Sequence, residues 1–367
     1  MKILHINCNY LGTTLHQLMV EKLEKMGLKN KVYVPVHSTT YKAIEPNPGV
    51  CVSESFKEWD RLVFDYKQRK IYRDIQHKIN IADFDCIHAY TLFTDGNTAM
   101  KLSKKYNKPY VVAVRNTDVN DFFRLMVHLR GRGVKIMRNA SAIFFLSESY
   151  RKQVFEKYVP EKYREELLKK TYIIPNGIDD FWFENAYCRQ AKVAPGKIKL
   201  IYAGRIDKNK NIPTTQRAID ILRSRGLDVS LTVVGKTIDK DEFEIIDKHS
   251  FTEYIEAKPK EELLNIYRNS DIFVMPSFAE SFGLVYVEAM SQGLPVIYSK
   301  GQGFDGQFED GKVGFAVDSA SAEQIAEAIE KISANYASIA KNLPSMATKF
   351  NWDAICEKYS LLYQEIK

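Results

Sequence analysis

The fold is decided most clearly by residues 272–290, which read IFVMPSFAESFGLVYVEAM. The first four residues form a continuous apolar run of strand length. The next eight begin with proline, end with glycine and contain two serines, which is typical of a loop. This order predicts a buried strand at Ile272–Met275, a loop at Pro276–Gly283 and a helix that begins at Leu284. A strand followed by a helix is the repeating unit of an α/β protein with a parallel sheet.

The same alternation runs through the whole chain. The first half predicts strands at Lys2–Ile6, Lys31–Pro35, Cys86–Ala89, Tyr110–Val114, Ala142–Leu146 and Thr171–Ile174, with helices at Thr13–Met26, Trp59–Lys78 and Asp95–Tyr106. The second half predicts strands at Lys199–Ala203, Val229–Val234, Ile272–Met275 and Pro295–Ser299, with helices at Ile212–Arg225, Lys240–Lys248, Lys260–Arg268 and Leu284–Gln292. Parallel strands that are covered on both faces read as unbroken apolar runs, and several of these do. We therefore expect two parallel sheets, each flanked by helices.

Length and composition fit two domains. A chain of 367 residues with 45% hydrophobic residues can bury two cores of ordinary size. The turn formers at Pro175–Asp179 predict a junction, which gives domains at 1–180 and 181–350. The final segment, 351–367, has apolar residues on one helical face from Trp352 to Ile366, so it must pack on another surface. We expect that surface to belong to the first domain.

The residue types and their spacing argue against several classes of protein. Five scattered cysteines without a CxxC pair are typical of reduced thiols in a cytoplasmic protein. Seven histidines form no HExxH motif, so the sequence predicts no metal site and no cofactor. No GxGxxG follows the first strand of either domain, which disfavours a dinucleotide oxidoreductase. No apolar run has the ~18 residues that a membrane-spanning helix needs, and no export signal is evident.

The charge is uneven. Residues 1–180 contain 30 lysines and arginines against 20 acidic residues, whereas the rest of the chain is mildly acidic. The first domain is therefore expected to meet an anionic partner: nucleic acid, an anionic lipid surface or a phosphorylated acceptor. No nucleic-acid-reading motif is present, which disfavours the first. Two segments, 59–73 and 121–135, mix apolar and basic residues. Each fits either a helix at a membrane interface or a core-packed helix with solvated cations.

Charged residues gather in loops that follow strands. In a parallel sheet, ligands bind at the carboxyl ends of the strands. Arg205 and Lys210 follow one such strand and can hold a diphosphate. The loop at Pro276–Gly283 follows another and opens a helix, whose unpaired amides attract phosphate. Glu280 and Glu288 stand eight positions apart and can engage different parts of one ligand, such as a sugar and a ribose diol. Taken singly, each has a plain alternative as a surface ion pair or a solvated loop.

Together these residues resemble the retaining GT-B glycosyltransferases of family 4, the glycosyl transferases group 1, of the bacterial surface-polysaccharide type. The likeness is carried by residues 280–297, by 204–211 and by 175–179, and it covers about 170–350. A looser likeness in the first domain rests on 87–90, 94–96 and 108–118. The resemblance implies two facing Rossmann-like domains, with a C-terminal helix that returns to the first.

The resemblance also implies roles for individual residues. Arg205 and Lys210 would bind the diphosphate, Glu280 the donor sugar, and Glu288 the ribose. The remaining donor contacts would come from Gly235 and Ala257, near the base, and from Ser281, Phe282, Gly283 and Leu284 through their backbone. The leaving phosphate itself would take the acceptor's proton, so no protein base or metal is required.

The first domain departs from the family pattern in two places. The first loop, Asn9–Thr14, has one glycine, Gly12, where the family is glycine-rich, and the resemblance implies that Gly12 approaches the phosphate of the donor. Arg115 stands where the family tends to carry a histidine, and arginine cannot act as a base. Arg115 could bind an anionic sugar or an acceptor phosphate, or it could pair with Asp118 or Asp121. His88 is a second candidate for contact with the sugar or acceptor, although strand-end histidines are more often core residues.

The expected function is retaining, metal-independent transfer of a sugar from a nucleotide diphosphosugar to a hydroxyl of a glycan or lipid-linked acceptor. The resemblance implies UDP as the nucleotide of the donor. The expected place is the cytoplasm, or the inner face of the membrane. Two alternatives stay open: a nucleotide-sugar epimerase or hydrolase of the same fold, which would form product without an acceptor, and a non-catalytic sugar-nucleotide-binding protein, which would show no turnover.

Overall fold

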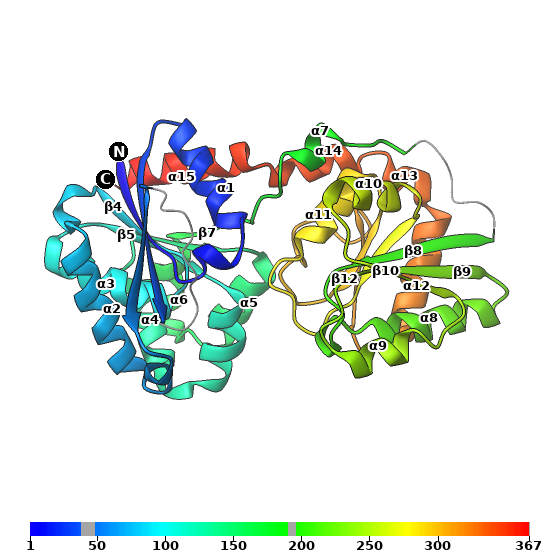
Figure 1. Ribbon diagram of the computed structural model, residues 1–367, viewed down its shortest axis with the longest axis horizontal. Coiled ribbons are helices and arrows are strands. Elements are labelled where there is room, and N and C mark those ends of the chain that lie inside the picture. Colours follow the sequence, from blue (N-terminus) through cyan, green and yellow to red (C-terminus); the bar gives the residue numbers. More distant parts are fainter. Residues whose placement is uncertain (38–47, 190–195, 367) are drawn as a thin grey trace. The chain divides into compact units, whose positions relative to one another are not determined.

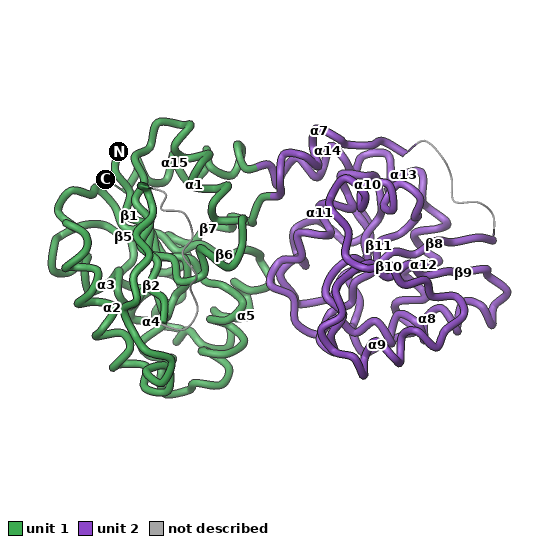
Figure 2. The backbone as a smooth tube through the Cα atoms, in the orientation of Figure 1, with its two compact units in different colours: residues 1–177, 352–367 green, residues 178–351 purple. Residues whose placement is uncertain are grey.

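The computed structural model describes residues 1–37, 48–189 and 196–366. The chain divides into two compact units, drawn in different colours in Figure 2. Unit 1 comprises residues 1–177 and 352–367, and unit 2 comprises residues 178–351. The expected boundaries lay after residues 180 and 350. Each unit is built around one parallel sheet (Figure 1).

The sheet of unit 1 has seven strands in the order β3-β2-β1-β4-β5-β6-β7. The strands are β1 (Lys2–Ile6), β2 (Lys29–His37), β3 (Val50–Phe56), β4 (Cys86–Ala89), β5 (Tyr110–Val114), β6 (Ala142–Phe145) and β7 (Thr171–Ile173). All neighbours pair in parallel. From β1 the chain first builds towards one edge, through β2 and β3, and then returns to build towards the other from β4. The strand order therefore reverses between β1 and β4.

Helices cover both faces of this sheet because alternate strand residues point to opposite sides. On one face, Leu4, Ile87 and Val112 pack against helices α2, α3 and α4. On the other, Ile3, Val111 and Phe144 pack against α1 and α15. These helices are α1 (Leu15–Lys25), α2 (Phe64–Lys78), α3 (Thr94–Tyr106), α4 (Arg130–Asn139) and α15 (Trp352–Glu365), and α5 (Glu148–Lys157) and α6 (Glu161–Leu168) complete the unit.

The last helix of the chain is part of unit 1, beside α1 (Figure 1). Ile355, Tyr359 and Tyr363 are buried in the core that α15 shares with α1 and the sheet. Lys22 of α1 forms an ion pair with Asp353 at 2.9 Å. Helix α15 therefore completes one face of the sheet that the N-terminal residues begin.

Unit 2 has a six-stranded parallel sheet in the order β10-β9-β8-β11-β12-β13. Its strands are β8 (Lys197–Ala203), β9 (Asp228–Gly235), β10 (Thr252–Glu256), β11 (Ile272–Met275), β12 (Val296–Ser299) and β13 (Gly314–Val317). Its helices are α7 (Phe181–Glu184), α8 (Ile212–Ser224), α9 (Lys240–Ile246), α10 (Lys260–Arg268), α11 (Leu284–Ser291), α12 (Ala322–Ala334), α13 (Tyr336–Ala340) and α14 (Leu343–Ala347). Here the strand order reverses between β8 and β11.

The two mixed apolar and basic segments are not the single helices that the sequence suggested. The first divides at Val63, whose extended backbone separates the short 3₁₀ helix η2 (Glu58–Leu62) from α2. The second divides into η4 (Asp118–Phe123), η5 (Val127–Leu129) and α4. No helix in the described part of the chain is long and apolar enough to cross a bilayer.

Candidate functional site

Two loops of unit 2 lie side by side at the carboxyl end of its sheet. One follows β8 and contains Gly204–Asn211, and the other follows β11 and contains Pro276–Gly283. Because β8 and β11 are neighbours and the strand order reverses between them, these loops border the topological switch point. In open α/β sheets, a ligand-binding crevice forms at such a point.

Two asparagines fasten the loops to each other. Asn209 exchanges hydrogen bonds with the backbone of Ala279, at 2.9 and 3.0 Å. Asn211 adopts a left-handed backbone, with φ of 56°, and donates from its amide to the Pro276 carbonyl at 3.0 Å. Asparagine tolerates this conformation better than most residues. Lys210, which stands between the two asparagines, is thus held in a fixed turn.

Lys210 and Glu280 form the central ion pair of this site. Lys210 Nζ lies 2.7 Å from Glu280 Oε2, and each side chain is only 12% exposed. Glu280 Oε1 accepts the backbone N–H of Ser281 at 3.0 Å. A phosphate oxygen could replace the carboxylate as the counter-charge of Lys210, which would leave Glu280 able to accept hydrogen bonds from hydroxyl groups.

Arg205 lies on the same loop but is oriented differently. Its side chain is 69% exposed, and Nε is 3.8 Å from Asp207 Oδ2. Its backbone is fixed, because the Tyr202 hydroxyl donates to the Arg205 carbonyl. Within the described residues, no hydrogen bond or ion pair joins its guanidinium to Glu280. The structure therefore brings Lys210 and Glu280 together and leaves Arg205 beside them, facing solvent.

Helix α11 begins at the second loop with a glycine that no other residue replaces easily. Gly283 has φ of 75°, and a Cβ there would lie 2.3 Å from the Tyr286 ring. The first amides of the helix lack intrahelical acceptors, so they face the loop region as donors. Phe282 is 1% exposed and packs against Phe304 and Phe350, and therefore only its backbone can meet a ligand. Ser281 is exposed and Leu284 is half-buried.

Glu288 lies on α11, one turn beyond Leu284. Burial raises the pKa of its carboxyl to about 7, and the negative charge of Asp179 adds to this effect. Asp179 is itself paired with Lys260 at 2.7 Å. A half-buried carboxyl with a raised pKa is costly to ionise in the folded protein, and such groups cluster at binding and catalytic sites.

Gly235 and Ala257 end two neighbouring strands of the same sheet. A Cβ on Gly235 would lie 1.6 Å from the Gly204 carbonyl oxygen, so glycine permits the close approach of the β8 and β9 ends. Ala257 is the exposed residue that follows β10. The Tyr254 hydroxyl donates to the Gly235 carbonyl at 3.0 Å. Both positions lie at the carboxyl end of the sheet, where the Lys210 loop also lies.

A second hollow, of about 660 Å³, lies in unit 1 at the carboxyl ends of its strands. Cys8 and Gly12 follow β1, Thr91 follows β4, and Asp118 follows β5. Its other walls include aromatic and aliphatic residues (Phe56, Leu62, Phe64, Phe122 and Met126), the cations Arg61 and Lys67, and the acidic residue Asp121. This hollow borders the switch point between β1 and β4.

Lys67 is the half-buried cation of this hollow. Its ammonium lies 4.4 Å from the centroid of the Phe56 ring, and burial lowers its pKa. Among the described residues it has no ion-pair partner. A cation in this setting is suited to an anionic ligand group, because phosphate or carboxylate would supply the missing counter-charge.

Arg115 is held by neutral groups rather than by an acid. Its guanidinium donates to the Asn176 side chain at 2.8 Å and to the Tyr90 carbonyl at 3.2 Å. Asp118 accepts the backbone N–H of Arg115, and also those of Leu92 and Phe93. Burial raises the pKa of Asp118 to about 6. One of the two alternatives for Arg115, a side-chain ion pair with Asp118 or Asp121, is therefore not formed among the described residues.

His88 is a core residue, which was the commoner of its two interpretations, and it is not a contact of the sugar or acceptor. Its side chain is fully buried and stacks on Tyr90 with 4.3 Å between ring centroids. Its Nδ1 lies 2.6 Å from the Tyr363 hydroxyl of α15. Burial lowers its pKa well below the usual value, so the ring stays neutral. We therefore withdraw His88 as a ligand-contacting residue.

The comparisons with known proteins agree with this geometry. Residues 185–349 match the family model of the glycosyl transferases group 1. The D-inositol 3-phosphate glycosyltransferase of Paenarthrobacter aurescens is 24% identical over 84% of this chain and 81% of its own. The capsular polysaccharide biosynthesis glycosyltransferase CapM of Staphylococcus aureus is 32% identical over 36% of this chain and 35% of its own. Anabaena HepE, solved in complex with UDP, has the same fold, with a TM-score of 0.74, 17% identity and full coverage of both chains.

The chain is a glycosyltransferase. Each of its two units has the parallel, helix-covered sheet of a Rossmann-like domain, as the sequence predicted for the GT-B fold class. The family match falls within unit 2, which carries the Lys210–Glu280 pair.

Sequence reasoning missed several residues that shape the glycosyltransferase's candidate sites. Asn209 and Asn211 were part of a quoted motif, but nothing in their spacing indicated that they fasten one loop to the other. Gln302 accepts the backbone N–H of Glu280 from a distant loop, at 3.0 Å. Lys67 was one of many cations on a basic helix. Asn211 alone carried a usable signal, because asparagine before a helix often caps it.

Gly12 and Gly283 predict opposite responses to alanine. A Cβ on Gly12 would meet nothing within 4 Å, so Gly12→Ala should leave stability unchanged or raise it by about 0.4–1 kcal/mol. Gly283→Ala should lower it by at least about 1–2 kcal/mol, because of the left-handed backbone and the Tyr286 ring. Urea denaturation of the two variants measures both effects. If Gly12→Ala nevertheless weakens the binding of a nucleotide sugar, Gly12 approaches the ligand.

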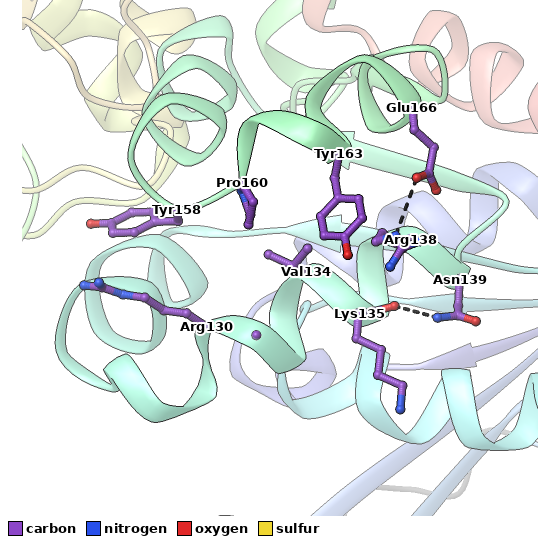
Figure 3. Close-up of a pocket in the computed structure, with 10 residues that line it drawn as sticks. Arg130, Val134, Lys135, Arg138, Asn139, Tyr158, Pro160, Tyr163 and Glu166 are labelled. Carbon is purple, nitrogen blue, oxygen red and sulfur yellow. Dashed lines mark hydrogen bonds and ion pairs between the residues drawn. The ribbon is translucent and has the colours of Figure 1, made fainter.

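Unit 1 also has a shallower basic hollow, of about 720 Å³, between α4 and α6 (Figure 3). Arg138 stacks on the Tyr163 ring, with 3.9 Å between the guanidinium carbon and the ring centroid, and lies 3.5 Å from Glu166. Arg130 lies over the Tyr158 ring at 4.9 Å. Both arginines thus pack against neighbouring aromatic rings, and Glu166 balances part of the charge.

Proposed function

We propose that this glycosyltransferase moves a sugar from a nucleotide diphosphosugar, a UDP-sugar, to a hydroxyl of a glycan or lipid-linked saccharide, with retention at the anomeric carbon. The transfer serves the synthesis of a cell-surface polysaccharide or glycolipid on the cytoplasmic side of a membrane. The donor is held by unit 2 and the acceptor by unit 1. The capsular polysaccharide enzyme and the UDP complex among the similar proteins support this choice.

The observation that carries the proposal is the half-buried Lys210–Glu280 pair at the mouth of α11. As the glycosidic bond breaks, negative charge grows on the departing diphosphate. Lys210 and the first amides of α11 are positioned to stabilise that charge, and such stabilisation is usually the largest single contribution to catalysis. Arg205, on the solvent side of the same loop, adds a guanidinium that can swing onto the diphosphate.

The two glutamates bind hydroxyl groups of the donor. Glu280, when its ion pair with Lys210 is broken, accepts hydrogen bonds from the transferred sugar, and Glu288 accepts them from the ribose. The nucleotide base lies beside Gly235 and Ala257. The sugar and phosphate contact the backbone of Ser281, Phe282, Gly283 and Leu284. No described cluster of three or more His, Cys, Asp or Glu residues could hold a metal ion, and we propose that the cationic loop takes that role.

The acceptor occupies the 660 Å³ hollow of unit 1, where Lys67 and Arg61 favour an anionic group. A relative that acts on D-inositol 3-phosphate supports an acceptor that carries a phosphate. The Arg115 guanidinium, which donates to the Asn176 side chain and the Tyr90 carbonyl, is a further cation that we assign to a phosphate of the acceptor, although it does not line the hollow itself.

A panel of sugar nucleotides tests donor binding by thermal shift. One nucleotide sugar should stabilise the wild-type protein, by about 2.7 kcal/mol at a hundredfold excess over Kd. The gain should collapse in Arg205→Ala and Glu288→Ala but persist in Lys208→Ala, which removes an exposed cation of the same loop. An equal gain in all four proteins would place the donor elsewhere. Product that forms without an acceptor would indicate hydrolysis or epimerisation instead of transfer.

A further inference from the structure

One edge of unit 1 carries a group of exposed apolar side chains beside its hollow. The group, called the apolar rim below, comprises Trp59, Leu62, Val63, Leu125, Met126 and Val127. Trp59 and Leu62 are each 80% exposed and Leu125 is 67% exposed. Large apolar side chains gathered in this way mark an interaction surface, because scattered single ones are normal but clusters are not.

The first part of the rim, Trp59, Leu62 and Val63, is exposed because of the conformation of helix η2 and the residue that follows it. Helix η2 is a 3₁₀ helix, in which side chains three apart share one face, so Trp59 and Leu62 point the same way. Asp60 lies on the inner side, where it accepts the Lys57 N–H and pairs with Lys70 at 2.6 Å. The exposure of Trp59 is thus built into a fixed turn.

The second part of the rim is fixed in the same manner. The Met126 N–H donates to the Phe122 carbonyl at 3.0 Å, and Leu129 is buried beneath the loop. The Arg130 guanidinium donates to the carbonyls of Phe123 and Arg124. Leu125, Met126 and Val127 are therefore displayed by a braced loop.

The two parts form one surface. Leu62 and Met126 both line the 660 Å³ hollow. Phe64, just after the first part, contacts Phe122, just before the second, with 5.8 Å between ring centroids. Arg132 and Asp65 form an ion pair that ties α4 to the start of α2. The rim consequently surrounds the entrance of the hollow on two sides.

The charge around the rim identifies the partner. Residues 57–70 and 121–132 contain eight lysines and arginines and four acidic residues, and two of those acids, Asp60 and Asp65, are already paired. Arg61 and Arg124 are exposed and have no ion-pair partner among the described residues. A rigid tryptophan and several aliphatic side chains, interleaved with unpaired cations, match the interface of a bilayer that contains anionic lipids.

We propose that the apolar rim docks unit 1 on an anionic lipid bilayer, so that the hollow opens at the membrane surface. The rim side chains enter the headgroup region and Arg61 and Arg124 contact lipid phosphates. Docking itself does not depend on the proposed function, but its consequence does: an acceptor in the hollow would then be carried by a lipid. Arg130 and Arg132 act inside the protein, as braces of the loop and of α2, and are not the lipid-binding cations.

Sedimentation with vesicles tests the docking. The full chain should pellet with phosphatidylcholine vesicles that contain phosphatidylglycerol, less so at high salt, and poorly with phosphatidylcholine alone. Trp59→Ser with Leu125→Ser should weaken partitioning by about tenfold or more. Arg61→Glu with Arg124→Glu should weaken it similarly and remove the salt dependence. All four side chains are exposed, so the melting temperature should not change.

Matched controls alter other exposed residues away from the rim. Leu361→Ser with Ile238→Ser, and Lys104→Glu with Lys152→Glu, should pellet like the parent. Pelleting of the rim variants at the parent's level contradicts the proposal, as does a parent that stays in solution at low salt. If light scattering shows a dimer that the rim variants abolish, the rim is an interface between copies of this chain. The thermal shift with nucleotide sugars should be normal in the rim variants, so a failure here is distinct from a failure of donor binding.

Discussion

Replacement of Lys210 by alanine is expected to lower kcat/KM for sugar transfer by about 100- to 1,000-fold, the usual effect of removing one pre-positioned group that stabilises transition-state charge. The Lys210 side chain is 12% exposed and held by the asparagine-fastened loop, so an exposed cation such as Arg205, which is not held in this way, should replace it only in part. Steady-state kinetics with the donor found in the thermal-shift panel measures the loss. The matched control is Lys208→Ala, two residues earlier on the same loop and 72% exposed, which should retain nearly full activity.

The double variant Lys210→Ala with Glu280→Gln separates catalysis from stability. Lys210→Ala alone leaves the Glu280 carboxylate nearly buried without its counter-charge, so the melting temperature should fall. Glu280→Gln removes that unpaired charge. The double variant should therefore recover stability without recovering the rate. If activity returns together with the melting temperature, Lys210 is a structural partner of Glu280 and the proposed catalytic role is wrong.

The sequence predicted the interior of both sheets far better than their edges. The missed strands β3, β10 and β13 are all edge strands. Interior parallel strands are buried on both faces and read as unbroken apolar runs, whereas β10 reads TEYIE and contains no fully buried residue. Helix α12 was also missed, although Ser321 caps it and Ile325, Ile329 and Ile332 have helical spacing. In that case the signal was present.

For the site, the sequence indicated which loops matter but not how their side chains pair. Lys210 and Glu280 are 70 residues apart, and their contact depends on β8 and β11 being neighbours. The predicted partner of Lys210, Arg205, turned out to face solvent because Asp207 and the loop turn draw it away. For His88 the sequence favoured a core position but could not name its partner, because Tyr363 of α15 returns from the other end of the chain.

Glu288→Gln should raise the stability of the protein at alkaline pH, and it should lower the affinity for the nucleotide-sugar donor. The pKa of the Glu288 carboxyl rises from its ordinary value of 4.5 to about 7 on folding, chiefly through burial. The folded state thus holds its proton more tightly than the unfolded state, so the carboxyl's contribution is fully present below pH 4.5 and is lost as pH rises through about 7. At pH 8 the free energy of unfolding is lower by at most about 3.4 kcal/mol, which is the pKa difference of 2.5 units multiplied by 1.36 kcal/mol per unit.

Denaturation at pH 5 and pH 8 measures this difference. The variant and wild type should be similar at pH 5, and the variant should be more stable at pH 8. Glu261→Gln, an exposed residue of α10 with the same loss of charge, should show no such change. Parallel pH profiles for wild type and Glu288→Gln would mean that the carboxyl is well solvated.

The same carboxyl should make donor affinity depend on pH. A ribose diol donates hydrogen bonds, and a carboxylate accepts them more strongly than a protonated carboxyl does. Donor binding would then favour ionised Glu288, and affinity should increase as pH rises from 6 to 8. In Glu288→Gln both the affinity for the donor and its pH dependence should fall, since the amide does not titrate in this range.

The carboxyl thus lowers the stability of the free protein and raises its affinity for the donor for the same reason. A group that is poorly solvated without a ligand gains most when hydroxyl donors bind. Isothermal titration calorimetry at both pH values measures the affinity for the donor. Equal affinities at pH 6 and pH 8 in the wild type would mean that Glu288 does not bind the ribose.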